Sequence, residues 1–405
     1  MKKLLVILTA LILTVCALFA LTSCFGTAED DDTFKVGFIF LHGENSTYDK
    51  NFMDAAKAVQ AELGLTNDQV LFEINIEEGP GCYEAAKRLV NKGCDVVFAD
   101  SFGHEDYMIQ AATEFPDVQF CHATGTKAHT TDLPNFHNAF ASIYEGRFVA
   151  GIVAGMKLQE MIDAGDFTAE EAKIGYVGAM PYAEVISGYT SFYLGVRSIV
   201  PEATMEVVYT HTWYNEALEK DAAVALIENG CKLISQHADS WGAPTACEDA
   251  GIPNVAYNGS TISAAPETYL ISSRINWAPY FKYMIESVQN GTAIVDDYCG
   301  GFDTGSVALT DLNTAAFEDA DAVQAAIDAA VAAFKAGTLD VFDTAKFTVG
   351  DNALTADFKA DVDSDANYAP DTKVVIDGIF EESKFRSAPY FNIIIDGITV
   401  PKDTK

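Results

Sequence analysis

The feature that most constrains this chain is a regular alternation of short apolar segments with amphipathic ones. In the first half, strand-type segments at 34–41, 69–76, 94–100 and 118–124 are separated by segments with helical spacing. The first, "FKVGFIFL", is short, apolar and rich in β-branched and aromatic residues, as buried strands are. Strands and helices that alternate with tight loops predict parallel sheets with right-handed crossovers.

The same alternation returns in the second half. Strand-type segments at 172–180, 204–212, 231–239 and 253–259 are again separated by helical ones. Between the two halves, the Gly-spaced segment 142–161 is predicted to be a helix that leads from the first unit to the second. We therefore predict an α/β chain with two doubly wound, Rossmann-like lobes joined by a hinge, which is the layout of a two-lobed binding protein.

Length and composition agree with two lobes. The chain is 49% hydrophobic and can bury sizeable cores, and about 380 residues after export exceed the size at which a single core stops growing. We predict a first lobe at 34–145 that is joined again by roughly 277–305. The second lobe is predicted at 146–276 with part of 306–405.

The N-terminus has the pattern of an export signal. Two lysines precede an apolar run at 4–21 that ends in "LTSC". This resembles a bacterial lipobox, so we predict a signal peptide at 1–23, lipidation of Cys24 and a lipid-anchored acidic tether at 24–33. The chain would then be extracytoplasmic and anchored to the bacterial cell membrane. A transmembrane anchor is the alternative, because the run approaches the roughly 20 residues that span a bilayer.

Charge and cysteine usage exclude several partners. Loss of two lysines with the signal takes the net charge from −34 to −36, which disfavours nucleic acid and anionic lipid headgroups. The remaining cysteines show no close CxxC spacing, and neither His122 nor His129 has a carboxylate or cysteine at ligand spacing. We therefore predict no metal and no cofactor. Disulfide pairing stays open for Cys82, Cys94, Cys121, Cys231, Cys247 and Cys299.

Aromatic and polar residues gather in the loops after the predicted strands. Doubly wound sheets bind ligands beyond the carboxyl ends of their strands, which points to loops 42–49, 100–106, 179–184, 210–215 and 236–242. These loops contain no Lys or Arg. Rings and amides suit a flat, neutral ligand that stacks and forms hydrogen bonds along its edge, whereas a phosphate would require basic residues or a Gly-rich loop. The binding candidates here are Asn45, Tyr48, Phe102, Tyr182, Trp213 and Asp239.

Six segments together carry a resemblance to a known family: "VGFIFLHGENSTYDKNFMDAAKA", "EFPDVQFCHATG", "SIYEGRFVAGIVAGM", "EVISGYTSFYLGVRS", "QHADS" and "INWAPY". They resemble the basic membrane protein (BMP) family, the substrate-binding lipoproteins of purine nucleoside and nucleobase ABC importers. The similarity runs from about residue 34 to 310, and the tail fits less well apart from "FRSAPYFNIIIDGI". The resemblance implies the type I periplasmic-binding-protein fold, with lobes that close over a purine.

The resemblance also assigns roles to single residues. Tyr48 stands where the family has a Trp or Phe that stacks on the base. Asn45 and Asn258 stand where relatives commonly carry Asp, which leaves open which edge of the base is read. Phe102 occupies the family's aromatic position after the third strand. The other positions that lie in family motifs are Trp213, Asp239 (in "QH-x-D") and Trp277 (in "INWAPY").

The segment "QHADS" also raises the possibility of catalysis, because His237, Asp239 and Ser240 are the residue types of a hydrolytic triad. Alternation at the end of a strand directs the first two to one side and turns the serine away. The chain has no GxSxG nucleophile elbow. We interpret Asp239 as an acceptor for amino or ring N–H groups of a ligand, with His237 orienting it.

The sequence therefore predicts a monomeric binding protein rather than an enzyme. It would capture a purine nucleoside or nucleobase and deliver it to an ABC permease that is driven by a separate ATPase subunit. Two alternatives stay open. One is a receptor of the same fold for a sugar or other small polar ligand, and the other is a secreted hydrolase that uses His237 or Asp239.

Overall fold

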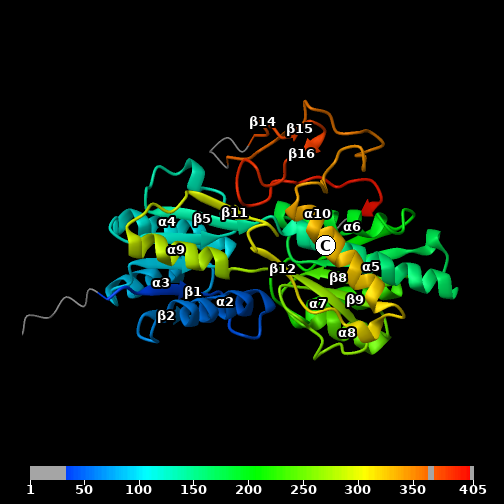
Figure 1. Cartoon of the computed structure of the whole chain (residues 1–405), viewed down its shortest axis with the longest axis horizontal. Helices are drawn as coiled ribbons and strands as arrows, with labels where there is room; N and C mark the ends of the chain where they lie inside the picture. Colours follow the sequence, from blue (N-terminus) through cyan, green and yellow to red (C-terminus); the bar gives the residue numbers. More distant parts are fainter. Residues whose placement is uncertain (1–32, 364–368, 402–405) are drawn as a thin grey trace, which may run out of the picture. The chain divides into compact units, whose positions relative to one another are not determined.

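The computed structural model describes residues 33–363 and 369–401 (Figure 1). The chain divides into two units, 1–34 and 35–405, and the second carries every helix and strand of the described residues. The predicted signal peptide, Cys24 and nearly all of the predicted tether lie outside the described range. None of the described helices is both long and apolar enough to cross a membrane.

The first sheet consists of parallel strands in the order β11-β5-β4-β3-β1-β2. Its strands in the described chain are β1 (Val36–Ile39), β2 (Val70–Glu73), β3 (Val96–Ala99), β4 (Gln119–Ala123), β5 (Phe136–Ala141) and β11 (Asp297–Gly300). Helices α3 (Pro80–Asn91) and α4 (Glu105–Glu114) cover one face, and α2 (Thr47–Leu63) and α9 (Ala278–Asn290) cover the other. We call this sheet and its helices the first lobe.

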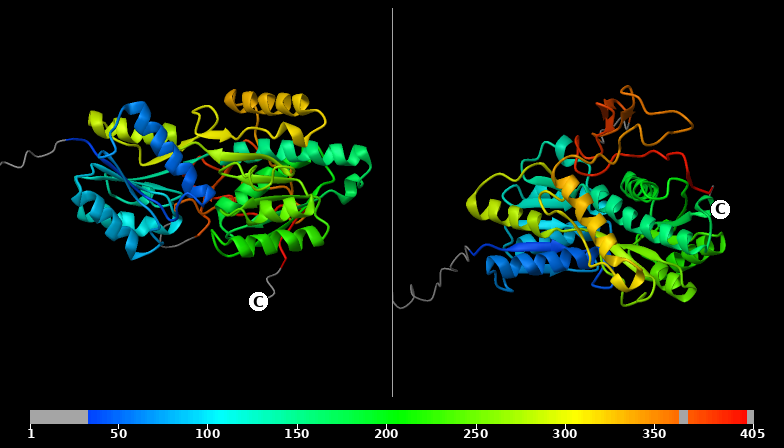
Figure 2. Two further views of the ribbon diagram at one scale, coloured as in Figure 1. Left: turned by 90° about the horizontal axis from the view of Figure 1, so that it is seen from below. Right: turned by 45° about the vertical axis from the view of Figure 1, so that its right-hand side comes forward.

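The second sheet repeats this plan in the order β12-β10-β9-β8-β6-β7-β17, and within this sheet, as far as the structure describes it, only β12 runs antiparallel to its neighbour. The strands are β6 (Lys173–Gly178), β7 (Thr204–Tyr209), β8 (Leu233–His237), β9 (Asn254–Tyr257), β10 (Tyr269–Ile275), β12 (Val307–Leu309) and β17 (Ile398–Thr399). The helices are α5 (Ile143–Ala164), α6 (Ala183–Arg197), α7 (Glu216–Glu228), α8 (Gly242–Ala250) and α10 (Ala320–Lys335). Figure 2 shows this second lobe, mostly green, beside the first. The predicted α/β fold with two doubly wound lobes is confirmed.

Helix α2, which follows the carboxyl end of β1, shows how the sequence determines the local structure. Ser46 caps its N-terminus by accepting a hydrogen bond from the Asp49 N–H, and Gly64 ends it in the left-handed conformation at φ 67°. Phe52 and Val59, seven residues apart and so on one face of the helix, are fully buried. Burying each such side chain stabilises the fold by roughly 1.5–3 kcal/mol.

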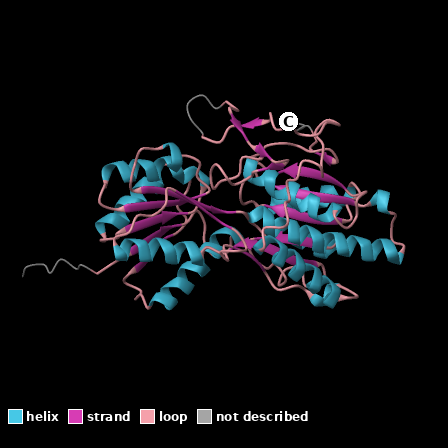
Figure 3. Cartoon of the chain, turned by 45° about the horizontal axis from the view of Figure 1, so that its top comes forward, coloured by secondary structure: helices cyan, strands magenta, loops and turns pink. Residues whose placement is uncertain are grey.

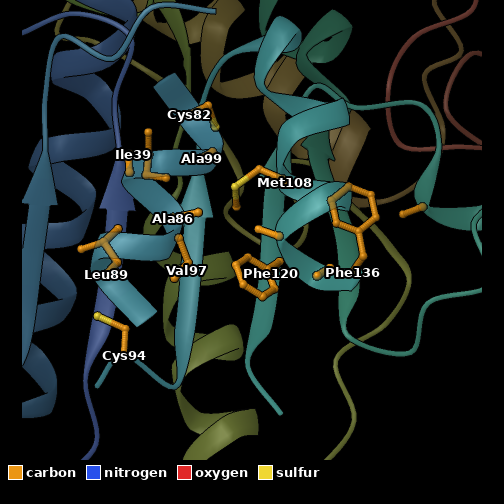
Figure 4. Close-up of a cluster of buried hydrophobic side chains, with 14 residues drawn as sticks. Ile39, Cys82, Ala86, Leu89, Cys94, Val97, Ala99, Met108, Phe120 and Phe136 are labelled. Atoms are coloured by element: carbon orange, nitrogen blue, oxygen red, sulfur yellow. The ribbon is translucent and has the colours of Figure 1, made fainter. Parts of the chain in front are cut away.

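The first sheet separates two cores. Figure 4 shows the cluster between the sheet and α3 and α4, where Leu89, Met108 and Phe120 are fully buried. Cys82 and Cys94 lie in the same cluster, and all six cysteines of the described residues are free thiols. Burial raises the pKa of Cys94 to about 12, so these cysteines act as small apolar side chains.

The core on the opposite face is aromatic. Trp277 stacks on Phe52 with ring centroids 4.3 Å apart, and Phe98 meets Phe281 edge to face at 4.8 Å. Trp277 is only 1% exposed. The cluster joins α2, α9 and β3 directly behind the carboxyl ends of the first sheet.

The glycine spacing of segment 142–161 has a packing reason. A Cβ atom on Gly151 would lie 2.1 Å from the Phe192 carbonyl oxygen, and one on Gly195 would lie 2.2 Å from that of Phe148. Helices α5 and α6 therefore contact each other backbone to backbone, which only glycine permits. The segment is the helix that the sequence predicts, and it packs in the second lobe.

The chain passes between the sheets three times, from β5 to α5, from β10 to α9 and from β11 to β12. Residues 369–401, here called the C-terminal segment, are drawn in red tones in Figure 1, and Figure 3 shows the chain with its top turned forward. Hydrogen bonds join this segment to both lobes. The Ser387 N–H donates to Asp297 Oδ2 of β11 at 2.8 Å, Ser187 of α6 donates to Glu382, and β17 pairs with β7. The segment also carries β14 (Thr372–Lys373), which pairs with β13 (Lys359–Ala360), and the hairpin β15 (Val375–Ile376) and β16 (Ile379–Phe380).

Candidate functional site

The carboxyl ends of strands from both sheets meet at a narrow pocket, here called the cleft pocket. Its lining residues are Leu41, Tyr48, Ser101, Phe102 and Thr124 from the first lobe and Glu184, Trp213, His237 and Asp239 from the second. Among these described residues there is no Lys or Arg. In this conformation the pocket has room for about one water molecule.

Tyr48 lies in the first turn of α2 and is held at both ends of its side chain. Its hydroxyl donates to the Asp100 carbonyl oxygen at 2.6 Å, and its ring meets Phe52 edge to face at 4.8 Å. Burial raises the pKa of Tyr48 well above its usual value, and nearby carboxyl groups, Glu184 first, add to the shift. The hydroxyl is therefore protonated, and the ring forms a fixed wall of the pocket.

A row of three rings crosses from one lobe to the other. The ring centroids of Phe102 and Tyr182 are 5.4 Å apart, and those of Tyr182 and Trp213 are 5.9 Å apart. Phe102 is 39% exposed and Tyr182 is 41% exposed, which is high for large apolar rings. Tyr182 lines an adjoining cavity rather than the cleft pocket itself.

Asp239 joins the lobes through its backbone and offers its carboxyl group to the pocket. Its carbonyl oxygen accepts from the Thr47 N–H at 3.1 Å and from Thr47 Oγ1 at 3.2 Å. The carboxyl group has no hydrogen-bond partner among the described residues. Burial raises the pKa of Asp239 well above its usual range, and the negative charges of Asp49, Glu219 and Glu184 add to the shift. An N–H donor on a ligand would satisfy this group.

His237 pairs with a different acid from the predicted one. Its Nε2 lies 3.4 Å from Glu184 Oε1, and the structure shows no contact that would let it orient Asp239. Burial lowers the pKa of His237 to about 4 although Glu184 opposes this shift, so the ring is neutral. Ser240 is fully buried and its Oγ accepts from the Gly242 N–H at 3.1 Å. The three residues therefore do not form a proton relay to a nucleophile.

Arg147 of α5 lies beneath the cleft pocket and was not among the predicted site residues. It is fully buried, its guanidinium carbon lies 3.4 Å from the centre of the Tyr257 ring, and its Nη1 donates to the Gln236 carbonyl oxygen at 3.0 Å. The sequence does hold a signal, an arginine in the apolar run "RFVAGIVAGM". Arg147 places positive charge behind His237, which helps to keep that ring neutral.

Two acids lie behind the first-lobe wall with opposite pKa shifts. Asp100 is fully buried, which raises its pKa well above the usual range, and the charge of Asp49 raises it further. Burial also acts to raise the pKa of Asp49, but hydrogen bonds from His42 and Ser46 outweigh it and the pKa is lowered. Of the two acids, Asp100 therefore holds a proton more readily and Asp49 loses one more readily.

Four predicted contacts lie outside the cleft pocket, and Tyr182 in the adjoining cavity is one of them. Asn45 is exposed on the loop before α2, because the chain turns at Ser46 to begin the helix. Asn258 faces a separate groove that is also lined by Arg274. Trp277 belongs to the aromatic core behind the sheet. The predicted residues that the structure brings to the pocket are Tyr48, Phe102, Trp213 and Asp239.

Sequence comparison gives a family for this chain. Residues 47–333 match the Bmp family, described as "ABC transporter substrate-binding protein PnrA-like". A purine-binding protein of Brucella abortus (strain 2308) is 33% identical over 70% of this chain and 77% of its own length. A Haloferax volcanii protein whose name describes a glucose-binding ABC transporter component is 36% identical over 52% of this chain and 50% of its own length.

Solved structures show the same fold. The solute-binding protein of an ABC transporter system from Conexibacter woesei is 19% identical, with 76% of this chain and 98% of that chain covered and a TM-score of 0.60. A solute-binding protein from Aeropyrum pernix is 14% identical, with 83% and 95% covered and a TM-score of 0.63. With the family match, the chain belongs to the Bmp family of ABC transporter substrate-binding proteins.

Proposed function

We propose that this protein captures a purine nucleoside or nucleobase outside the cytoplasm and delivers it to the permease of an ABC importer, with no chemistry of its own. The cleft pocket carries this proposal. Tyr48, Phe102 and Trp213 offer rings from both lobes, and Asp239 offers a buried acceptor that lacks a partner in the described chain. A purine is a flat ring with N–H donors on its edge, which matches this set. The purine-binding relative from Brucella supports the choice.

The proposed location and type of ligand rest on the lipobox-like sequence around Cys24 and on the net charge of the chain. Lipidation of Cys24 would hold the protein at the outer face of the bacterial cell membrane, next to a permease and its ATPase subunit. A net charge of −34 supports a small neutral ligand rather than a nucleic acid. We propose that the protein acts as a monomer.

Ligand entry requires the lobes to separate. The cleft pocket has room for about one water molecule, and the Thr47–Asp239 hydrogen bonds and the Phe102–Tyr182 contact cross it. The three passages of the chain between the sheets are the proposed hinge. A purine would bind the open form and be enclosed on closure.

Mass spectrometry of the small molecules released by denaturing the purified protein tests the function directly. We expect a purine. We also expect a rise in melting temperature with added purine, by mass action on the folded state, and a smaller radius of gyration in X-ray scattering. Glucose is tested in the same way, because the name of the Haloferax relative describes a glucose-binding protein. A shift with glucose alone would contradict the purine proposal, and free base released from an added nucleoside would contradict a purely binding role.

A further inference from the structure

A second cavity adjoins the cleft pocket and is bordered on one side by the C-terminal segment. Its volume is about 440 Å³, within the usual range for sites of small ligands. It shares Phe102, Thr124 and Glu184 with the cleft pocket. Its outer wall is formed by residues 386–392, which lie beyond residues 47–333 that match the family model and within the tail segment "FRSAPYFNIIIDGI".

Thr124 stands at the boundary of the two spaces with features of a ligand contact. It is 4% exposed, and its Oγ1 is buried with no hydrogen-bond partner among the described residues. Its φ of 65° is rare for a β-branched residue, and such strained positions concentrate at functional sites. A buried hydroxyl without a partner is unfavourable unless a ligand or water supplies one.

The strained turn is held in place by the acid next to it. Glu105 Oε1 accepts from the Thr126 N–H at 2.7 Å, the Lys127 N–H at 2.8 Å and Asn138 Nδ2 at 3.1 Å. Gly125 is required there, because a Cβ atom would lie 2.4 Å from the same Glu105 oxygen. The backbone of the turn that follows Thr124 is therefore held in place before any ligand arrives.

The outer wall is fixed as well. Arg386 folds back on its own turn, with Nε donating to the Ala388 carbonyl oxygen and Nη2 to that of Pro389, both at 3.0 Å. Ser387 binds Asp297 of the first lobe. Acids (Glu105, Asp106, Glu184) and bases (Lys127, Arg386) both line the cavity, so its charge does not select a strongly ionic group.

We propose that this cavity holds a polar, uncharged substituent of the ligand, with Thr124 Oγ1 as a hydrogen-bond partner and residues 386–392 as a specificity-determining wall. The inference rests on the proposed purine function. It assigns the C-terminal segment, which lies outside the family match, a part in choosing the ligand.

Calorimetric titration with hypoxanthine and inosine tests this, because the two share one ring system and only inosine carries a hydroxyl-bearing substituent. We expect the wild-type protein to bind inosine more tightly. Thr124→Val, which keeps the branched shape, should weaken inosine binding about 3- to 10-fold, the effect of losing one hydrogen bond. Hypoxanthine binding should stay within about twofold, and Thr124→Ser should behave as the wild type.

Asn392→Ala is an independent test of the wall, because Asn392 is exposed and its loss should not affect folding. We expect inosine binding alone to weaken. Equal losses for both ligands in Thr124→Val, or unchanged inosine binding in both variants, would overturn this inference and leave the purine function intact. If neither purine binds the wild-type protein, the inference and the proposed function fail together.

Discussion

The two lobes contribute different chemistry to the cleft pocket. The first lobe presents uncharged side chains, chiefly Tyr48 and Phe102, whereas the second presents titratable groups, Glu184, His237 and Asp239. The first lobe does contain acids near the pocket, but its Asp49 lies behind the wall and is satisfied by hydrogen bonds. This difference indicates a division of roles, in which the first lobe positions a ring and the second reads its polar edge.

The largest expected effect tests whether Trp277 stabilises the fold of the first lobe or contacts the ligand. Trp277→Ala should lower the free energy of unfolding by about 3–5 kcal/mol, because it removes a buried ring that stacks on Phe52. Urea unfolding measures the loss, and purine affinity of the protein that remains folded should be unchanged. The matched variant is Trp213→Ala in the second lobe, which should lose affinity with a smaller change in stability. Loss of purine affinity in Trp277→Ala at unchanged stability would show that Trp277 contacts the ligand and does not support the fold.

The second prediction concerns the acid of the second lobe. Asp239→Asn should weaken purine binding about 10- to 150-fold at a pH above the raised pKa of Asp239, where the carboxylate has formed, because a hydrogen bond to a charged group contributes about 1.5–3 kcal/mol. Asp54→Asn is the control, since it removes an exposed carboxylate from α2 outside the cleft pocket. Isothermal titration of both variants decides the matter. Equal affinities for Asp239→Asn and the wild type would show that the edge of the ligand is read elsewhere.

Protonation of Asp239 should make both the stability and the purine affinity of the protein depend on pH. The folded-state pKa of Asp239 is raised, so its carboxyl group is protonated more readily in the folded protein than in the unfolded chain. The stability that this adds is present at low pH and is lost as pH rises through the folded pKa. Purine affinity should change in the opposite sense, rising with pH as the carboxylate forms. Asp239→Asn should flatten this rise, and a rise of unchanged size in the variant would assign it to another group.

The sequence predicted the fold well because strand and helix periodicity are local properties. It placed the site at the strand ends, and Tyr48, Phe102, Trp213 and Asp239 do line the cleft pocket. The sequence did not show that Trp277 belongs to the core. An aromatic residue next to a strand end has the same local pattern whether it is buried in a core or lines a pocket.

The residues that were missed depend on tertiary packing. Arg147 reaches the site from the second turn of α5, which packs against α6, and only tertiary packing brings it next to His237. Thr124 reads as the end of a strand, and its significance comes from its backbone angle and from the C-terminal segment opposite. Glu184 ends one of the loops that the sequence points to, but it was not among the predicted contacts, and its partner His237 lies far along the chain.

The third prediction tests whether the first lobe acts through a ring face. Tyr48→Ala should weaken purine binding about 5- to 150-fold, because stacking on a base contributes roughly 1–3 kcal/mol. The structure adds a loss of stability, because the Tyr48 ring contacts Phe52 and its hydroxyl binds the Asp100 carbonyl oxygen.

Tyr48→Phe is the matched control, and it separates the ring from the hydroxyl. It should lose about 0.5–1.5 kcal/mol of unfolding free energy, since the 2.6 Å hydrogen bond to Asp100 is removed. Purine affinity should remain within about twofold, because the stacking face is retained and the hydroxyl is already engaged within the first lobe. Calorimetric titration and urea unfolding of both variants provide the two readouts. Equal losses of affinity in Tyr48→Ala and Tyr48→Phe would mean that the hydroxyl is the contact, and the first lobe would then read the polar edge of the ligand as the second does. Wild-type affinity in Tyr48→Ala would instead transfer the stacking role to Phe102 or Trp213, the remaining rings of the cleft pocket.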